Sequence, residues 1–471
     1  MRPYFYDRLS VVDNSFLAIE GPMTHQHVGG VILLEAAPLV RPDGSLAIDE
    51  IRRYVGARLH LIPRYRQKLR PVPFGTRHVW IDDQHFNLEY HVRHTSLPRP
   101  GDLRQLKRLS ARIVSQKLDR AKPLWEIWIV EGLEGGQHVA MVAKTHHCMV
   151  DGVSGVDLMA VLLSPSPTDG AAESPTWIPR PAPSSVQLLR DEWLRRLGEP
   201  LAALGETPCP FGDPRGLLAA GWERLEALGE ALGAAASPAS RTPLNQPIGP
   251  HRRFDWLAME LAAVKDVKNR LGGTVNDVVL ATVAGALQRF LERRRVNVDV
   301  LALRANVPVS LRTDDQRGTL GNQIALWMAD LPVAERDPVR RLARVRETTT
   351  RLKESRQALG AQVLAAVSEW TSSTLLSSAV RMATRSRPFN LVVTNVPGPQ
   401  IPLYMLGARI REFFPILALL DNQALGVALF SYDGTLCWGF VCDWDLVPDL
   451  HDFVLDVAGA FAELRAAAQR L

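Results

Sequence analysis

The strongest constraint on the fold of this chain is a break in its composition between residues 164 and 183. The stretch reads SPSPTDGAAESPTWIPRPAP, and its many prolines do not fit a regular helix or a central strand. At 471 residues the chain is also too long for one ordinary domain. We therefore expect an α/β protein with a first domain at 1–163, a partly helical connector at 164–251 and a second domain at 252–471.

Apolar patterns in the first part of the chain predict a sheet covered by helices. Val28–Glu35 and Gln137–Lys144 are rich in apolar and β-branched residues, which is typical of buried strands. The segment 102–118 between them places its apolar residues on one helical face and most of its arginines and lysines off that face. A further helix is expected at Val153–Leu163.

The second part of the chain shows the same mixture of strands and helices. A long apolar segment that follows two glycines and a helix-capping pattern predicts a long helix. The expected elements are helices at Thr274–Arg294 and Leu450–Gln469, and strands near Val298–Val309, Phe389–Thr394, Ala424–Ser431 and Leu436–Cys442.

Composition and charge exclude several functional classes. A net charge of +5 is small for this length, and no helix-turn-helix or RNP-like pattern occurs, so nucleic acid is not an expected partner. No run of about 18 apolar residues is present and the N-terminal segment lacks a secretory pattern, which predicts a cytoplasmic protein. Neither a CxxC pair nor zinc spacing occurs, so we expect no metal site and reduced thiols at Cys148, Cys209, Cys437 and Cys442.

The segment KTHHCMVDGVSG, residues 144–155, holds the best candidates for chemistry. Neighbouring residues of a strand point to opposite faces, so one of His146 and His147 can enter a cleft while the other packs behind. The same alternation makes the pair a poor metal chelate. Gly152 lets the loop turn, whereas the spacing of Asp151 does not show that it reaches His147. The residues alone allow either a general base or a polar side chain satisfied at a strand end.

His146–Gly152 matches the HHxxxDG motif of the CoA-dependent acyltransferase superfamily. Further segments narrow the resemblance, in the order KPLWEIWIVEGL, LNQPIGPHRRF, GGTVNDVVLATVAGAL, NVPVSLR, GNQI, TNVPGP and SYDGTLCWG. Together they resemble the bacterial wax ester synthase/diacylglycerol acyltransferase family over nearly the whole chain. The resemblance implies two chloramphenicol-acetyltransferase-like αβ sandwich domains joined by a long linker.

The resemblance also implies a reaction. A fatty acyl group would pass from acyl-CoA, a co-substrate, to a fatty alcohol or diacylglycerol, with no other cofactor. His147 would be the general base, and His146 would pack or hydrogen-bond inside the loop. Asp151 would be structural and paired with an arginine, for which Arg312 is the candidate; an ordinary surface arginine is the alternative.

Asn276 and Asp277 allow two interpretations. Thr274 and Asp277 have the spacing of a capping box, which places Asn276 in the first turn of a helix. Both side chains can be simple caps there, although free N–H groups and the helix dipole also favour negative charge at this end. The resemblance favours a role for Asn276 in positioning substrate or stabilising an oxyanion.

Two rigid motifs complete the set of candidate substrate-binding or structural residues. The PLW turn is either plain core or, by the resemblance, a neighbour of the acyl channel. The NVPGP loop has two prolines and is expected at the domain junction. The candidates are Pro123, Leu124 and Trp125 in the first motif and Asn395, Pro397 and Gly398 in the second.

Alternatives to the lipid acyltransferase stay open at this point. One is a condensation-type enzyme that uses a carrier-protein thioester, and another is a lipid-binding relative without catalysis. Cys148 invites a covalent mechanism, but acyl-CoA is already a thioester, so direct transfer is favoured. Lipidic substrates and amphipathic helices predict peripheral association with the inner membrane face or lipid droplets. The sequence does not decide between the acceptors, the acyl chain lengths or the oligomeric states.

Overall fold

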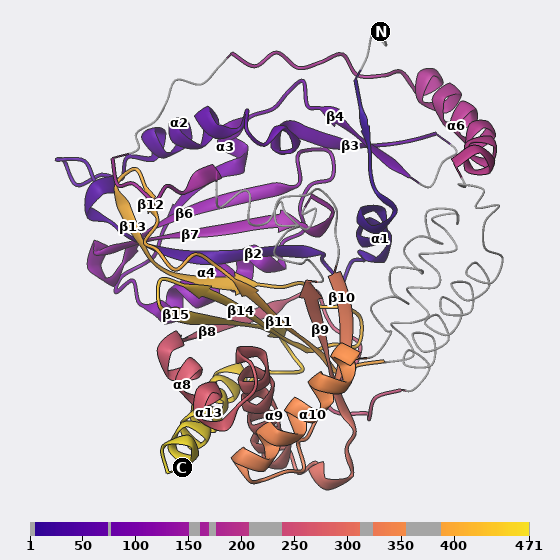
Figure 1. Cartoon of the computed structure of the whole chain (residues 1–471). Helices are drawn as coiled ribbons and strands as arrows, with labels where there is room; N and C mark the ends of the chain where they lie inside the picture. The colour runs from indigo at the N-terminus through magenta and orange to yellow at the C-terminus, as the bar shows by residue number, and fades with distance from the viewer. Residues whose placement is uncertain are drawn as a thin grey trace.

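The computed structural model describes residues 5–73, 77–149, 161–168, 176–206, 238–310, 324–354 and 388–470. This part of the chain forms two six-stranded sheets, one three-stranded sheet and the helices that cover them. Figure 1 shows the first large sheet in the upper part of the molecule and the second below it. The α/β fold class predicted from the sequence is confirmed.

The first large sheet comes mainly from the N-terminal part of the chain. The strands predicted at 28–35 and 137–144 are confirmed at its centre, where they pair antiparallel from His27 opposite His146 to Glu35 opposite His138. Its strands are β2 (His27–Glu35), β5 (Val92–Ser96), β6 (Trp125–Leu133), β7 (His138–His146), β12 (Tyr404–Met405) and β13 (Ala408–Ile416). Their spatial order is β12-β13-β2-β7-β6-β5.

The second large sheet contains the predicted C-terminal strands. The strand expected near Val298 begins at Leu303, because Val298–Val300 form a 3₁₀ turn whose N–H at Asp299 donates to the side chain of Asn297. The strands are β8 (Arg252–Glu260), β9 (Leu303–Ser310), β10 (Ile324–Leu331), β11 (Leu391–Pro397), β14 (Leu425–Tyr432) and β15 (Thr435–Asp443). They lie in the order β10-β9-β11-β14-β15-β8, and β11 is parallel to both of its neighbours.

The long helices begin at the capping patterns that the sequence shows. The capping box of Thr274 and Asp277 starts α9 (Val275–Arg293), as predicted, and Asp102 with Gln105 starts α4 (Leu103–Ser115). The closing helix is confirmed as α13 (Leu450–Gln469), while residues 153–160 of the helix expected after the histidines lie outside the described residues. The others are α1 (Val11–Ile19), α2 (Ile48–Arg58), α3 (Leu88–His91), α6 (Ser185–Glu206), α8 (Leu261–Leu271) and α10 (Pro338–Glu354).

The described connector folds onto the three-stranded sheet. Arg180 donates from its backbone N–H, its Nε and its Nη2 to the carboxylate of Asp82, at 2.7–2.9 Å. Tyr6 donates its hydroxyl hydrogen to Asp191 of α6 at 2.8 Å. These contacts anchor the described part of the connector, which contains α6, to the sheet and to the segment before β1. This sheet has the order β1-β4-β3, with β1 at Asp7–Arg8, β3 at Gln67–Pro71 and β4 at His78–Asp82.

A strand from the C-terminal part of the chain completes the first large sheet. β13 pairs antiparallel with β2, with Phe413 opposite Ile32 and Phe414 opposite Val31. No local sequence pattern predicts this pairing, since the two strands are hundreds of residues apart. The domain ranges expected from the sequence stay predictions. The pairing of β13 with β2 links the first of these ranges to the last.

The two large sheets share one hydrophobic core. Alternate residues of β2 point to opposite faces of its sheet and belong to two hydrophobic clusters. Val31 and Leu33 pack in the cluster that includes the second sheet. Ile32 and Leu34 pack in the cluster on the other face. The helix α4 packs against β7 and β8 and adds Leu106 to the shared cluster. Figure 1 shows α8, α9, α10 and α13 beneath the second sheet.

Gly439 of β15 is a position where this packing leaves no space for a side chain. A Cβ atom there would lie 1.8 Å from the backbone oxygen of Pro415 in β13. We expect Gly439→Ala to lower the free energy of unfolding by about 1–3 kcal/mol, because one of the two strands has to move.

Thermal unfolding of the variant checks this expectation, with Gly459→Ala in α13 as the matched control. A Cβ at Gly459 would meet only the end of the flexible Arg289 side chain within 3 Å, and alanine is the better helix former. Equal melting temperatures for Gly439→Ala and the parent would contradict the close contact between β13 and β15.

Candidate active site

The histidine pair lies where β7 ends and a single 3₁₀ turn, η4 (His147–Met149), begins. The N–H of His146 donates to the carbonyl of Leu124 at 2.9 Å. The N–H of His147 donates to the carbonyl of Gln26, beside β2, at 2.7 Å. The residues that directly precede β6 and β2 therefore hold the backbone of the two histidines.

His147 is partly buried and stacks against α1. The rings of Phe16 and His147 lie with their centroids 3.8 Å apart and their planes 20° from parallel. Its Nδ1 is buried and has no hydrogen-bond partner among the described residues. Burial lowers the pKa of His147 to about 4, since the charged ring would lose hydration. The imidazole is therefore neutral at pH 7, the state that a general base requires.

His146 is buried behind the turn, with a side chain only 1% exposed. Its Nδ1 accepts the N–H of Cys148 at 3.1 Å, so the neutral ring carries its hydrogen on Nε2. This Nε2 lies 3.5 Å from Oε1 of Glu20, the residue that follows α1. His146 thus connects the turn η4 to a buried carboxylate.

Glu20 places a negative charge inside the protein, since its side chain is 1% exposed. Its Oε2 accepts hydrogen bonds from Nη2 and Nε of Arg120 at 2.6 and 3.0 Å, and Nζ of Lys117 lies 3.4 Å away. His27 Nε2 lies 3.8 Å from Oε1. Burial alone would raise the pKa of Glu20, but the contacts with His146 and Arg120 hold it well below its ordinary value.

Glu20 and its cations cannot be recognised as a cluster from the sequence. Glu20 and Arg120 are 100 residues apart, so no local pattern pairs them. The one signal is a carboxylate directly after an apolar helix, and this signal alone predicts a helix end. The pairing requires the tertiary structure.

Cys148 lies next to the catalytic candidate but is poorly suited to be a nucleophile. Its side chain is 3% exposed. Burial raises the pKa of the Cys148 thiol well above its ordinary value. The thiol is therefore protonated at pH 7, whereas a nucleophilic cysteine has to be a thiolate.

Asn276 and Asn395 come together at the start of α9. The amide nitrogen Nδ2 of Asn395 donates to Oδ1 of Asn276 at 2.7 Å, which joins α9 to β11. Asp277 is engaged as a cap, because its Oδ2 accepts the N–H of Thr274 at 2.7 Å. Its Oδ1 accepts the hydroxyl hydrogen of Thr349 at 2.7 Å. Asp277 is therefore satisfied, while the Nδ2 of Asn276 can still donate.

A cavity of about 230 Å³ opens beside Asn276. Leu280 and Trp327 give it an apolar wall, and Lys353 adds a cation. The indole Nε1 of Trp327 is buried without a hydrogen-bond partner among the described residues. The cavity combines hydrogen-bond donors with an apolar wall, as substrate-binding sites do.

One rigid motif contacts His146 and the other contacts Asn276. Leu124 and Trp125 are fully buried, and the indole N–H of Trp125 donates to the carbonyl of Tyr65 at 2.8 Å. The carbonyl of Leu124 accepts the N–H of His146. Gly398 follows β11, where a Cβ would lie 2.4 Å from the oxygen of Ser431, so a larger residue does not fit. Pro397 pairs with Ser431 in the sheet.

Several predicted site residues lie outside the described part of the chain. They are Asp151, Gly152 and Arg312, so the pairing expected between Asp151 and Arg312 has no described geometry. Within the described residues no hydrogen bond or ion pair joins the histidine turn to the Asn276 group. No cluster of three or more His, Cys, Asp or Glu side chains in this part could hold a metal ion.

Two family descriptions match the chain. The wax ester synthase/diacylglycerol acyltransferase catalytic domain matches residues 9–279, and the C-terminal domain of the same family matches residues 320–465. A Mycobacterium tuberculosis protein named as a diacylglycerol O-acyltransferase is 33% identical over 94% of this chain and 87% of its own length. The protein named tgs1, with the same activity in its name and from the same organism, is 31% identical over 98% and 97%.

Solved structures agree with these matches. The wax ester synthase/diacylglycerol acyltransferase from Marinobacter aquaeolei VT8 has a TM-score of 0.69 and 27% identity, over 98% of this chain and 100% of that one. Trichothecene 15-O-acetyltransferase from Fusarium sporotrichioides has a TM-score of 0.61 at 13% identity, over 98% and 96%, which is a likeness of fold alone. The chain therefore belongs to the wax ester synthase/diacylglycerol acyltransferase family and is an acyltransferase.

Proposed function

We propose that the protein transfers a long-chain fatty acyl group from acyl-CoA to the hydroxyl of a fatty alcohol or a diacylglycerol. The products are a wax ester or a triacylglycerol and free CoA. The observation that carries the mechanism is the neutral, partly accessible imidazole of His147, whose backbone N–H donates to Gln26 and whose ring stacks on Phe16. The names of the relatives favour diacylglycerol as an acceptor.

His147 takes the proton of the acceptor hydroxyl as its oxygen attacks the thioester carbonyl. Nδ1 is buried, so we assign the hydrogen of the neutral ring to it and leave Nε2 to meet the hydroxyl. The C–S bond then breaks, and the departing CoA thiolate receives the proton from the imidazolium. A ring with a pKa of about 4 is a weak base at rest, but it is almost entirely in the neutral form at pH 7.

Asn276 stabilises the oxyanion that forms during the attack. Asn395 donates to its Oδ1, which fixes the amide and leaves its Nδ2 to donate. The N-terminus of α9 adds the positive end of the helix dipole at the same place. The role of Asp277 is to cap this helix.

The remaining predicted residues position these groups. Asp151 and Gly152 shape the turn after His147, and Arg312 is the proposed partner of Asp151. Glu20 supports the turn from behind through His146. The PLW and NVPGP motifs fix the backbones that carry the histidines and Asn395.

The function is tested by incubating purified protein with palmitoyl-CoA and either hexadecanol or diacylglycerol. Release of free thiol should depend on the acceptor, and chromatography should show the matching ester. Thiol release without any ester, or no release with both acceptors, would contradict the proposed reaction.

His147→Ala should reduce acyl transfer by roughly 10²–10⁴-fold, because the proton acceptor is lost. Its melting temperature should stay near that of the parent, since the ring is partly accessible. His146→Ala is the matched control and should destabilise more, because it removes a buried partner of Glu20. Near-normal turnover of His147→Ala would overturn the assignment.

The pH profile gives a second readout of the same residue. The pKa of His147 is lowered to about 4, so the neutral form persists as the pH falls below the ordinary histidine pKa of about 6.5. We expect kcat/KM to stay constant as the pH falls and to decrease only well below pH 6. Circular dichroism should show that the protein stays folded over this range. An acid limb near pH 6.5 would contradict the lowered pKa of His147.

Cys148→Ala should keep most of the activity, because the buried thiol stays protonated. Initial-rate plots with both substrates varied should then intersect, as expected for direct transfer. Parallel lines or an acyl group trapped on Cys148 would show a covalent pathway instead.

Glu20→Gln should lower kcat more than it changes KM, since the turn that holds His147 loses its charged support. The free energy of unfolding should fall by about 1–3 kcal/mol, because Arg120 and Lys117 stay partly hydrated. The control is Glu35→Gln, which removes a surface ion pair with Arg411 and should cost less than about 1 kcal/mol. A normal kcat with a lower melting temperature would show that Glu20 has a structural role alone.

We further propose that the protein associates peripherally with the cytoplasmic face of the membrane or with lipid droplets. Both acceptors are lipids, and none of the described helices is long and apolar enough to cross a bilayer. Flotation with anionic vesicles should recover the protein at low salt, and high salt should release it. Failure to float at low salt, or release only after strong solubilisation, would contradict this mode of association.

A further inference from the structure

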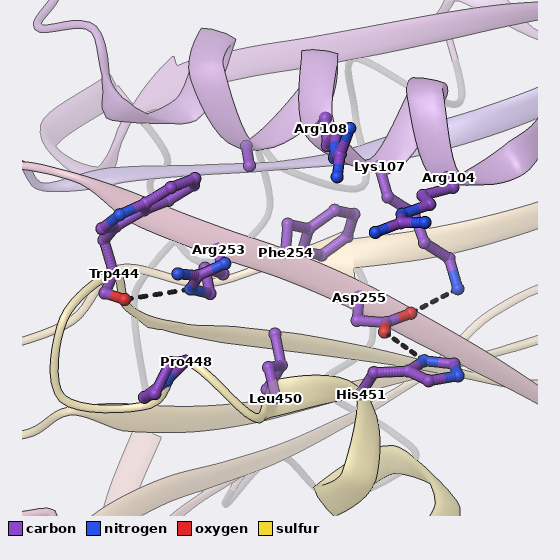
Figure 2. Close-up of a pocket in the computed structure, with 11 residues that line it drawn as sticks. Arg104, Lys107, Arg108, Arg253, Phe254, Asp255, Trp444, Pro448, Leu450 and His451 are labelled. Carbon is purple, nitrogen blue, oxygen red and sulfur yellow. Dashed lines mark hydrogen bonds and ion pairs between the residues drawn. The ribbon is translucent and has the colours of Figure 1, made fainter.

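A second and larger cavity, of about 930 Å³, lies where α4 faces β8 and the start of α13. Figure 2 shows α4 as one wall, with β8 and the loop that leads into α13 as the other. None of the candidate catalytic or substrate-binding residues lines this cavity. The function proposed above therefore leaves it unexplained.

The wall of this cavity is strongly cationic. Its carboxylate, Asp255, is already engaged by an ion pair with Lys107 and by Nδ1 of His451 at 2.9 Å. Within the described part of the chain Arg104 and Arg108 take part in no hydrogen bond or ion pair, so both guanidinium groups can bind an anion. The four cationic residues of the wall are Arg104, Lys107, Arg108 and Arg253.

The cavity also offers flat and apolar surfaces. Trp444 is 43% exposed, and the guanidinium of Arg253 lies 3.8 Å from the centroid of its ring. The Nε of Arg253 donates to the carbonyl of Trp444 at 2.9 Å, which holds the two flat groups together. Phe254 and Leu450 are buried and also line the cavity. The guanidinium lies over one face of this ring, and the outer face of such a pair is a surface on which a nucleobase can stack.

We propose that this cavity binds a phosphorylated nucleoside. Its phosphate lies on Arg104 and Arg108, which are four residues apart and therefore on one face of α4. Guanidinium groups match phosphate oxygens in a bidentate way, and the base packs against Trp444. The volume is within the range of sites that enclose small ligands.

The concave shape favours a soluble nucleotide over a membrane surface. Figure 2 shows the side chains of Arg104 and Lys107 extending from α4 toward β8, with Arg108 close beside the helix. A flat bilayer would not reach groups that face another element in this way. The nucleotide end of acyl-CoA has the required chemistry, and identification with that donor rests on the proposed function; nucleotide binding itself does not.

Calorimetric titration of the full chain with 3′-phosphoadenosine 5′-phosphate tests the proposal. The parent should bind saturably, and the double variant Arg104→Ala/Arg108→Ala should bind on the order of 10–100-fold more weakly. Arg112→Ala is the matched control, because Arg112 is an exposed arginine of the same helix outside the cavity lining. Its affinity should equal that of the parent.

Three results would overturn the proposal: no saturable binding to the parent, equal affinity in the double variant, or binding to phosphatidic acid vesicles without binding to the nucleotide. His147→Ala should bind the nucleotide normally, which separates this test from that of the proposed reaction. Displacement of the nucleotide by CoA would identify the donor as the ligand. Binding without displacement by CoA would assign the site to a separate nucleotide.

Discussion

The hydrogen-bonded pairing of β13 with β2 is the interaction on which the arrangement of the site depends. It brings a strand of the C-terminal part of the chain into the sheet that carries the histidines. Alternation along β13 then serves both cores, since Phe414 stacks on Trp256 with centroids 4.9 Å apart while Phe413 meets Phe430 at 4.5 Å on the other side. Because interiors are close-packed, the two large sheets have little freedom to move relative to each other.

Buried charges add a second set of links around the histidine turn. Arg252, with a side chain 4% exposed, donates to the carbonyls of Met23 and Gly249 at 2.5 Å, and so joins the start of β8 to the segment before β2. Lys144 donates to the carbonyls of Ile113 and Gln116 at the end of α4. With Glu20, these groups surround the turn with polar contacts that are costly to break one at a time. A neutral His147 at the edge of this network is positioned without carrying a charge itself.

Local patterns predicted the parts of the fold that local physics controls. The capping box at Thr274 and Asp277 was readable because all its donors and acceptors lie within one helical turn. The strands β7 and β14 were readable because buried strands are continuous apolar runs. In contrast, β13 is not predicted from the sequence, since its partner strand is distant. The ion pair of Glu35 with Arg411 at the same junction joins residues that are 376 positions apart.

The sequence by itself determined the α/β class, most of the elements and, through its motifs, the family and the histidine pair. Tertiary structure alone decided which groups surround that pair. Glu20, for example, pairs with Arg120, which is 100 residues away in the sequence and comes close only in the folded protein. It also decided the state of His147, since a histidine takes its pKa from burial, and burial depends on the packing of α1 against η4. The cationic cavity has the same origin: α4 and β8 are far apart in the chain, and their side chains meet only after the two sheets have packed together.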